Sequence, residues 1–368
     1  MNKNKLISYI QLINTPGIGP IHFKKLLERF GDIDRVLSEI SLKCKIFARN
    51  KAEEELMTAE IKHVKIITME DDIYPYNLKQ IEDCPPILYA FGNTDLLKNN
   101  NAVAMVGARN ASLSAQRTAE QISIELAKKD IVIVSGMARG IDSAAHKGAL
   151  SVNGKTIAVL GTGIDIIYPK ENEKLYKELH QKGLIISEYP FHTGPQASNF
   201  PRRNRIVSGL SKGVLVVEAT TRSGSLITAN QALEQGRDVY AVPGAPHDGR
   251  SAGCNKLIKE GAVLVESAED ILDNFNFTQV TFEPNKTKKL EITDLFEYSL
   301  DNQKNNNDIS ENNDSYSKLL SLISETGENI DDLIQISALP AEEVLMMIVE
   351  MELDGKLIRL PGNKVAKT

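Results

Sequence analysis

The chain has 368 residues, of which 42% are hydrophobic and 25% are charged, and its formal net charge is −6. These values are ordinary for a globular protein, and the length is enough for two or three domains. The negative charge argues against a generally basic, DNA-coating protein, so any contact with nucleic acid must come from a local patch.

The three cysteines lie far apart and predict neither a disulfide framework nor a zinc site. The N-terminal apolar run is soon broken by polar residues, which makes it a poor signal peptide, and no apolar stretch is long enough to span a bilayer. We therefore expect a cytoplasmic protein that makes no contact with a membrane.

Residues 1–63 are expected to form a helical domain around the turn Thr15-Pro16-Gly17-Ile18-Gly19-Pro20. Apolar residues recur at helical spacing on both sides of this turn. The arrangement resembles a helix-hairpin-helix, in which glycines let the turn backbone approach a phosphate. The alternative is a plain tight turn, and it is favoured because no lysine or arginine lies inside the turn.

Residues 64–275 alternate short apolar runs with amphipathic segments. The main runs are Val103–Val106, Ile131–Val134, Thr156–Leu160, Leu184–Ser187, Val214–Val217, Val239–Val242 and Ala262–Val265, and Val64–Met69 and Ile87–Phe91 add two more. Nearly continuous β-branched runs are typical of strands buried on both faces. The repeated alternation predicts an α/β fold with an extended, Rossmann-like, doubly wound sheet.

Two segments complete the chain. Residues 276–316 are polar and asparagine-rich and are expected to be a linker, because they offer too little apolar surface to offset the entropy of ordering. Residues 317–368 show three helical patterns followed by a short hairpin over Leu357–Leu360 and Lys364–Ala366, which predicts a winged helix. Its third helix carries acidic residues but no basic residue before Lys356, so a protein contact is more plausible than reading of duplex DNA.

The segment Asn199–Ser211 is basic, whereas the chain as a whole has a negative net charge. Arg202, Arg203 and Arg205 fall within four positions, and Phe200 stands beside them. Arginine suits phosphate and an aromatic face can stack on a base, so the segment favours a site that grips a nucleic-acid backbone. The alternative is a solvated helix start whose arginines pair with carboxylates.

Loops that follow parallel strands meet at one edge of a sheet, where ligands bind. Four such loops are unusual for their glycines and small or charged residues: 107–112, 135–142, 161–172 and 218–225. They are expected to bring Arg109 and Lys170 to the same rim as the arginines of 202–205. No dinucleotide fingerprint and no P-loop is present, so the pattern favours a polyanion over a nucleotide cofactor.

The search for a catalytic group returns little. Asp142 and His146 are four positions apart on an expected helix, yet a carboxylate at the helix start with a packed histidine beside it is favoured over a catalytic pair. Glu188 and Glu218 follow strands, and an ion pair is the expected role of each. No metal-ligand cluster stands out among the histidines, and no cofactor is expected.

Several motifs stand together in one order. They are Val106-Gly107-Ala108-Arg109, Ser135-Gly136-Met137-Ala138-Arg139-Gly140-Ile141-Asp142, Gly161-Thr162-Gly163-Ile164-Asp165, Tyr168-Pro169, Phe200-Pro201-Arg202-Arg203-Asn204-Arg205-Ile206, Ser223-Gly224-Ser225-Leu226-Ile227-Thr228-Ala229 and Ala241-Val242-Pro243-Gly244. In these motifs, and over essentially its whole length, the chain resembles the DNA-processing protein A family, DprA or Smf.

The resemblance implies a non-catalytic protein. Members of the family bind incoming single-stranded DNA in natural transformation, protect it and help to load the recombinase RecA, generally as dimers through the Rossmann-like domain. By motif position, the DNA-binding residues are expected to be Arg109, Ser112, Gly136, Ala138, Arg139, Gly140, Lys170, Asn172, Phe200, Arg202, Arg203, Asn204 and Arg205.

Two other functions stay open on the sequence alone. One is an enzyme such as a nucleoside-monophosphate hydrolase, which would use the same crevice with Asp142, His146, Glu188 or Glu218 as acid or base. The other is a regulator of duplex DNA acting through the winged helix, against which the acidic third helix counts.

Overall fold

The computed structural model describes residues 2–42 and 44–275, together with parts of the segment 319–367. Those parts are 319, 323, 328–329, 333–334, 337, 344, 347–348, 351, 357–360 and 364–367. The chain forms two compact units, Met1–Val280 and Thr281–Thr368. The expected linker at 276–316 lies outside the described residues.

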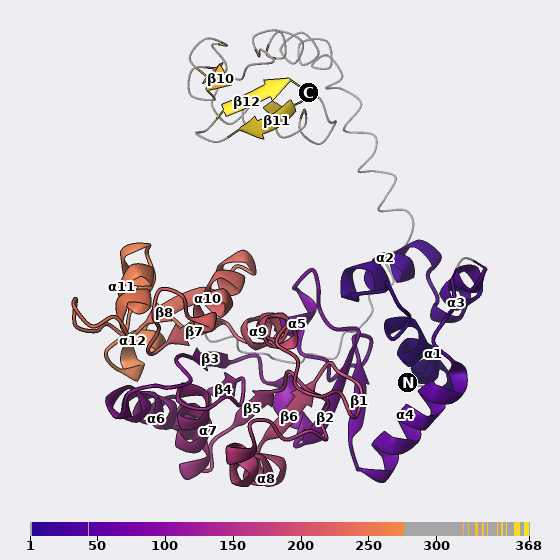
Figure 1. Ribbon diagram of the computed structural model, residues 1–368, viewed down its shortest axis with the longest axis horizontal. Coiled ribbons are helices and arrows are strands. Elements are labelled where there is room, and N and C mark those ends of the chain that lie inside the picture. The colour runs from indigo at the N-terminus through magenta and orange to yellow at the C-terminus, as the bar shows by residue number, and fades with distance from the viewer. Residues whose placement is uncertain are drawn as a thin grey trace, which may run out of the picture. The chain divides into compact units, whose positions relative to one another are not determined.

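The N-terminal helices are α1 (Lys3–Ile13), α2 (Pro20–Phe30), α3 (Ile33–Ser41) and α4 (Arg49–Ile61). Helices α1 and α2 stand on either side of the turn at 15–20, as the apolar spacing predicts, with Pro20 in the first turn of α2. The rings of Tyr9 and Phe23, both fully buried, lie 5.2 Å apart and join the two helices. Figure 1 shows this group of helices beside strand β1, at one end of the sheet.

The first unit is built on one sheet of nine strands. They are β1 (Lys65–Thr68), β2 (Ile87–Gly92), β3 (Ala102–Val106), β4 (Val132–Ser135), β5 (Thr156–Val159), β6 (Leu184–Ser187), β7 (Gly213–Val216), β8 (Asp238–Ala241) and β9 (Val263–Leu264). Their order is β1-β2-β6-β5-β4-β3-β7-β8-β9. Strands β3 to β9 pair in parallel, which confirms the doubly wound fold, whereas β1 and β2 extend the sheet antiparallel beyond β6.

Helices cover both faces of the sheet. One face carries α6 (Leu113–Lys128), α7 (Ile141–Ser151), α8 (Glu173–Lys182) and α12 (Ala268–Leu272), and the other carries α5 (Tyr76–Lys79), α9 (Asn199–Gly209), α10 (Gly224–Glu234) and α11 (Ala252–Lys259). Two short 3-10 helices, η1 (Thr94–Lys98) and η2 (Lys170–Asn172), lie in loops. Alternate residues of β3 supply the two cores, with Ala104 and Val106 in one and Val103 and Met105 in the other.

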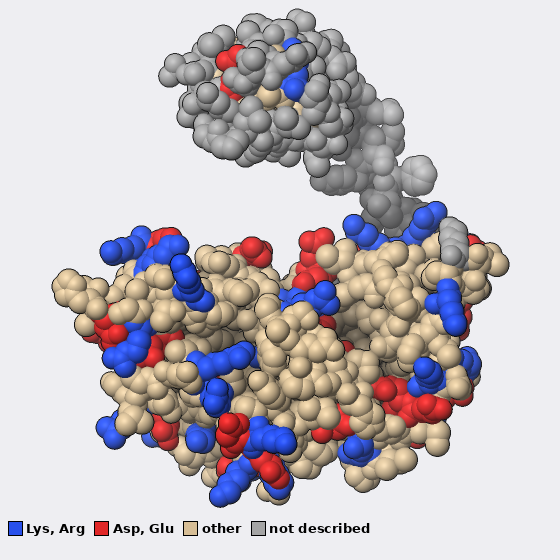
Figure 2. Space-filling model, in the orientation of Figure 1, with Lys and Arg blue, Asp and Glu red and all other residues tan. Residues whose placement is uncertain are grey.

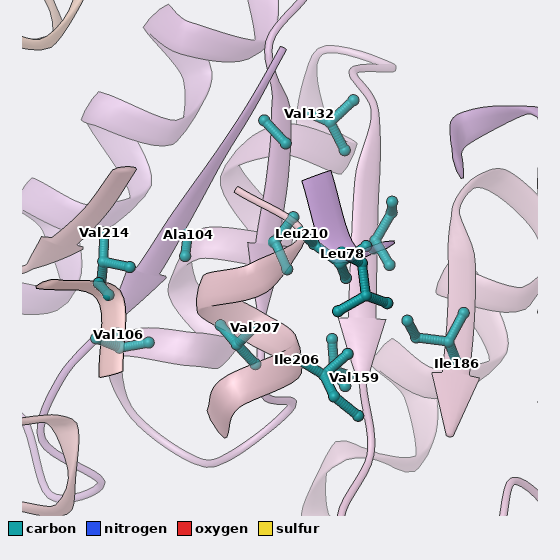
Figure 3. Packing of buried hydrophobic residues seen from close by; sticks show 14 of the residues in the cluster. Leu78, Ala104, Val106, Val132, Val159, Ile186, Ile206, Val207, Leu210 and Val214 are labelled. Atoms are coloured by element: carbon teal, nitrogen blue, oxygen red, sulfur yellow. The ribbon is translucent and has the colours of Figure 1, made fainter. Parts of the chain in front are cut away.

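Helix α9 contains the three arginines of the segment 199–211, and its apolar residues pack against the sheet. Ile206, Val207 and Leu210 are buried in one cluster with residues from β3, β4 and β5. Figure 3 shows these three side chains among the strand residues of that cluster. A fully buried Leu, Ile or Val contributes roughly 1.5–3 kcal/mol to folding. The position of α9, and of the polar residues on its other faces, is therefore set by the core.

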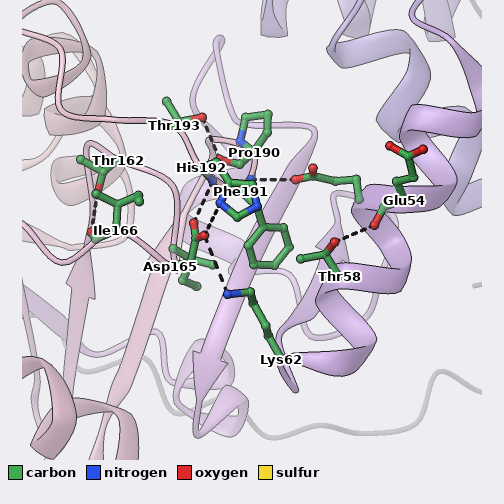
Figure 4. Close-up of polar contacts among 12 residues, drawn as sticks. Glu54, Thr58, Lys62, Thr162, Asp165, Ile166, Pro190, Phe191, His192 and Thr193 are labelled. Atoms are coloured by element: carbon green, nitrogen blue, oxygen red, sulfur yellow. Dashed lines mark hydrogen bonds and ion pairs between the residues drawn. The ribbon is translucent and has the colours of Figure 1, made fainter.

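The N-terminal helices are tied to the sheet by a polar cluster next to strands β5 and β6. Lys62 Nζ and His192 Nδ1 lie 3.9 and 2.8 Å from the same carboxylate, that of Asp165, whose side chain is only 9% exposed (Figure 4). The amide of Phe191 donates to Glu55 of α4 at 2.8 Å. The N-terminal helices thus pack directly against the loops after β5 and β6.

In the second unit, β11 (Leu357–Leu360) and β12 (Lys364–Lys367) form the predicted hairpin. A short strand that the sequence pattern missed, β10 (Glu328–Asn329), pairs with β12 and completes a three-stranded sheet. Leu333, Val344 and Ile348, which lie in helical segments, are buried in one cluster with Leu357 and Val365 of this sheet. Within the described part of the chain, no helix is long and apolar enough to cross a bilayer.

Candidate nucleic-acid interface

The sheet changes direction between β3 and β7, because the chain runs outward from β3 through β4, β5 and β6 and then returns to β7. In open α/β sheets such a switch point forms a crevice at the carboxyl ends of the strands. Two adjoining cavities of about 490 and 640 Å³ lie there. The residues common to both are Arg109, Ala138, Tyr168, Pro195, Phe200 and Arg203. We call the two together the groove.

An aromatic pair stands in the middle of the groove. Phe200, in the first turn of α9, is half-buried, and its ring centroid is 5.5 Å from that of Tyr168, which is 40% exposed. The guanidinium carbon of Arg109 lies 5.2 Å from the centroid of Phe200. A Cβ added at Gly161 would lie 2.9 Å from the Phe200 ring, so glycine at this position leaves room for the ring. A stacking surface thus stands beside a cation.

The loop between β4 and α7, residues 136–140, forms one wall of the groove and is held from beneath. The Asp142 carboxylate accepts from the amides of Gly136 and Ala138 at 3.1 and 3.2 Å. Asn172 donates to the carbonyl of Met137 at 2.8 Å and to Ser143 Oγ at 2.9 Å. Asn172 is buried, so its observed role is to support this loop, and the DNA contact that the family resemblance implies for it stays a prediction.

Arg203 also lies beneath the loop. It is only 4% exposed, and its Nη1 donates to the carbonyl of Gly136 at 2.5 Å and to the carbonyl of Val159. Burial lowers the pKa of Arg203 to about 10, with nearby Asp142 opposing that shift, so the guanidinium stays charged at neutral pH. A Cβ at Gly136 would stand 2.5 Å from this guanidinium. In this structure Arg203 supports the groove floor, and its expected contact with DNA stays a prediction.

The other two arginines of the segment point away from the groove. Arg205 is 7% exposed and pairs with Asp83 at 3.0 Å and with Glu188 at 2.5 Å. Arg202 is exposed, and both arginines line a separate cavity. The expectation that all three arginines converge on one rim is wrong, because a helix distributes neighbouring residues over different faces. For Arg205, the interpretation as a helix arginine paired with carboxylates is the one observed.

Ser112 and Glu218 form a second internal contact. Ser112 caps α6 by accepting from the amide of Ala115 at 3.1 Å, and its own amide and hydroxyl donate to Glu218 at 3.1 and 2.7 Å. The expected ion pair of Glu218 is not found in the part of the chain that the structure describes: its observed partner is the start of α6, where a negative charge is stabilised. The expected ion pair of Glu188 is confirmed, with Arg205 as the partner.

Gly140 and Asn204 differ in their access to the groove. Gly140 adopts φ +74°, and a Cβ there would lie 2.3 Å from the carbonyl of Ala108, so its role is to let two loops meet. Asn204 lines the larger cavity, together with the start of α10 at Ser223–Ser225. The residues at the start of α10, and Tyr168, were not among the predicted contacts, although both lie within motifs of the sequence.

Three exposed cations line the smaller cavity: Arg109, Arg139 and Lys170. Arg139 lies 3.8 Å from Glu171, and because both side chains are more than half exposed this pair is weak. Among the described residues, neither Arg109 nor Lys170 has a carboxylate within 4 Å. Figure 2 shows lysine and arginine side chains gathered in the middle of the face in view. The groove thus offers available positive charge around an aromatic surface.

Each candidate acid–base group makes at least one internal contact. His146 is fully buried, with Nδ1 2.7 Å from Thr156 Oγ1, and burial lowers its pKa to about 3. Asp142 stands in the first turn of α7 and bonds the loop amides, which confirms the favoured reading of this pair as structural. Burial raises the pKa of Glu188, an effect that the Arg205 charge opposes.

These features define an extended Rossmann-like protein whose crevice carries cations and aromatics. The family model described as "DNA recombination-mediator protein A" matches residues 65–276, and the model described as "DprA winged helix domain" matches residues 304–363. The chain therefore belongs to the DNA recombination-mediator protein A family, known as DprA or Smf.

Relatives support this assignment along most of the chain. DNA processing protein DprA of Streptococcus pneumoniae is 47% identical over 221 residues, which cover 60% of this chain and 78% of the relative. Protein Smf of Escherichia coli is 39% identical over 320 residues, which cover 87% and 82%.

Two solved structures have the same fold. DNA processing protein A of S. pneumoniae matches with a TM-score of 0.65 and 40% identity, over 75% of this chain and 99% of the other. DNA processing protein A of Helicobacter pylori, described by its single-stranded DNA binding mode, matches with a TM-score of 0.53 and 32% identity, over 58% of this chain and 96% of the other.

Proposed function

We propose that this chain binds single-stranded DNA in the groove and serves as a recombination mediator without catalysing a reaction. The observation that carries the proposal is the placement of Phe200 and Tyr168 beside Arg109 and Lys170, which are exposed and have no carboxylate partner within the described ranges. Aromatic faces stack on unpaired bases, and cations hold the backbone, whichever bases are present. The H. pylori relative is described by its single-stranded DNA binding mode, which agrees with this proposal.

Each part of the groove has a separate task in this proposal. Phe200 and Tyr168 stack on bases, while Arg109, Lys170 and Arg139 neutralise phosphates. The loop at 136–140 presents a fixed wall, because it is bonded from below by Asp142, Asn172 and Arg203. A wall that is already ordered loses little conformational entropy when the strand binds.

The wider role follows from the family. We propose that the bound strand is incoming DNA in natural transformation, that the protein protects it in the cytoplasm, and that it helps to load RecA. We further propose that it acts as a homodimer through the Rossmann-like domain. That Asp142, His146, Glu188 and Glu218 are all held by internal contacts supports a binding protein over a hydrolase.

Titration of labelled oligo-dT and of a matched duplex at two salt concentrations tests the proposal. We expect the single strand to bind more tightly than the duplex and its affinity to fall as salt rises, because phosphate contacts release counterions. Equal or tighter binding of the duplex, or no binding of the single strand at low salt, would refute it. Release of base or phosphate from a nucleotide panel would favour the hydrolase instead.

A further inference from the structure

A third cavity, of about 820 Å³, lies between the N-terminal helices and the sheet, within the first unit. Its walls are the end of α1 and the start of α2, the segment just before β2, and α9 with the residues after β6. This cavity is larger than either cavity of the groove. We call it the N-terminal cavity.

The floor of the N-terminal cavity is apolar and partly aromatic. It is lined by Ile13, Ile18, Ile21, Pro86, Ile87 and Tyr189. Ile21 is 38% exposed, and the hydroxyl of Tyr189 lies 3.4 Å from the carbonyl of Asn199 at the start of α9, which holds the ring beside that helix. Flat apolar surface with an aromatic ring is what a nucleobase packs against.

The rim of the N-terminal cavity carries charge of both signs. The two carboxylates, Asp83 and Glu188, are both bonded to Arg205. Lys25 of α2 and Arg202 of α9 are exposed, and within the described residues neither has a carboxylate within 4 Å. The acids are thus already engaged by one cation, while two other cations stay available to a phosphate.

One helix separates this cavity from the groove. Phe200, Arg203 and Asn204 of α9 line the groove, whereas Arg202 and Arg205 line the N-terminal cavity. Phe200 and Arg202 stand two positions apart and therefore lie on different faces of α9, one toward each cavity, so a strand that contacts both must pass over this helix. The core contacts of Ile206 and Val207 keep this dividing helix in place.

We propose that the N-terminal cavity is a second nucleotide site, which takes an unpaired stretch of the same strand that fills the groove. A base packs on the apolar floor, and the adjoining phosphates meet Arg202 and Lys25. This inference rests on the proposed function of the groove. It explains how a helix-hairpin-helix turn without a lysine or arginine of its own contributes to binding: the cations come from the following helix and from α9.

Affinity as a function of strand length tests the inference on the full chain. Oligo-dT of about 6 and about 20 nucleotides, lengths that span common site sizes, is titrated with the parent and with Lys25→Glu and Ile21→Glu. Both positions are exposed, so the fold tolerates the changes. Lys51→Glu, an exposed lysine of α4 that does not line this cavity, makes the same charge change and serves as the control.

We expect the long strand to bind the parent at least tenfold more tightly than the short one. Lys25→Glu and Ile21→Glu should lose most of that gain while keeping the affinity for the short strand, and Lys51→Glu should resemble the parent. If both cavity variants keep the parent's length dependence, or the parent shows none, the inference is overturned while the groove proposal stands. If the parent binds neither oligonucleotide, the groove proposal fails.

Crosslinking identifies the occupant directly. Oligo-dT of about 20 nucleotides carrying 4-thiothymidine is irradiated with the parent protein, and the attached peptides are mapped by mass spectrometry. Crosslinks to His22 or Tyr189, both on the wall of the N-terminal cavity, support the second site. Crosslinks confined to the groove would overturn it. A dependence on Lys25 that is seen for binding of a matched duplex but not of the single strand would also overturn it.

Discussion

Arg203 and Arg109 both line the groove, but Arg203 is 4% exposed beneath the loop at 136–140, whereas Arg109 is exposed beside Phe200. The floor, to which Arg203 belongs, also holds Asp142 and Asn172, and each of these three side chains bonds the loop backbone. The rim offers Arg109 and Lys170, neither of which has a carboxylate within 4 Å among the described residues. The same residue type stabilises the fold in one region and is available to a ligand in the other, and burial decides which.

Removal of the floor arginine is expected to have the largest effect. Arg203→Ala removes the positive charge that acts most strongly on buried Asp142 and leaves two carbonyls without a donor, so it should lower the free energy of unfolding by roughly 3–5 kcal/mol. Urea denaturation measures the change. Arg202→Ala, at the exposed neighbour, is the matched control and should stay within about 0.5 kcal/mol of the parent. If the two variants were equally stable, the claim that Arg203 stabilises the fold while an exposed arginine does not would be contradicted.

The aromatic surface is expected to come second. Phe200→Ala should weaken binding of oligo-dT by about 1–3 kcal/mol, because each base stacked on an aromatic side chain contributes about that much. Fluorescence anisotropy with labelled oligo-dT measures the loss. Phe200→Tyr keeps the aromatic ring and its packing against Gly161 and should bind like the parent. Phe200→Leu separates packing from stacking, and parent-like affinity in that variant would contradict a stacking role.

Buried His146 makes stability depend on pH. The pKa of His146 is about 3 in the folded chain and roughly 6.5 when unfolded, so between these values only the unfolded state takes up the proton. Above about pH 6.5 this proton uptake does not affect the free energy of unfolding. Below that pH it lowers the free energy of unfolding by up to about 1.4 kcal/mol per pH unit. Burial raises the pKa of Asp142 and of Glu188, which acts in the opposite direction at acid pH.

Comparison with a variant isolates the histidine from these carboxyl groups. His146→Gln removes the titrating group, and its free energy of unfolding should fall less steeply than the parent's from pH 6 to pH 5, by about 1 kcal/mol. Denaturant unfolding at the two pH values gives both slopes. Parallel slopes would show that His146 is not held neutral in the core.

Much of the fold was predictable from the sequence, for a physical reason. Strands buried on both faces must be nearly continuous apolar runs, and Val103–Val106 and Leu184–Ser187 coincide closely with β3 and β6. The antiparallel direction of β1 and β2 was not predictable, because an apolar run carries no information on strand direction. Strand β10 is only two residues long and has no periodicity to detect.

The site was predictable as a location but less so residue by residue. Loops after parallel strands meet at one edge, which brings Arg109 and Lys170 to one cavity. Which arginine of 202–205 faces the groove depends on where α9 starts, and Ser198 makes no side-chain capping bond that would mark that start. The internal partners of Asn172 and Ser112 depend on contacts between distant segments, which no local pattern reveals.

The salt dependence of single-strand binding tests the division between rim and floor most directly. Affinity for oligo-dT is measured from low to high salt for the parent and for the rim double variant Arg109→Ala/Lys170→Ala. Each phosphate contact on a single strand contributes about 0.7 to the slope of log affinity against log salt, so the double variant should show a slope shallower by roughly 1.4. A folded double variant with the parent's affinity and slope would contradict the account.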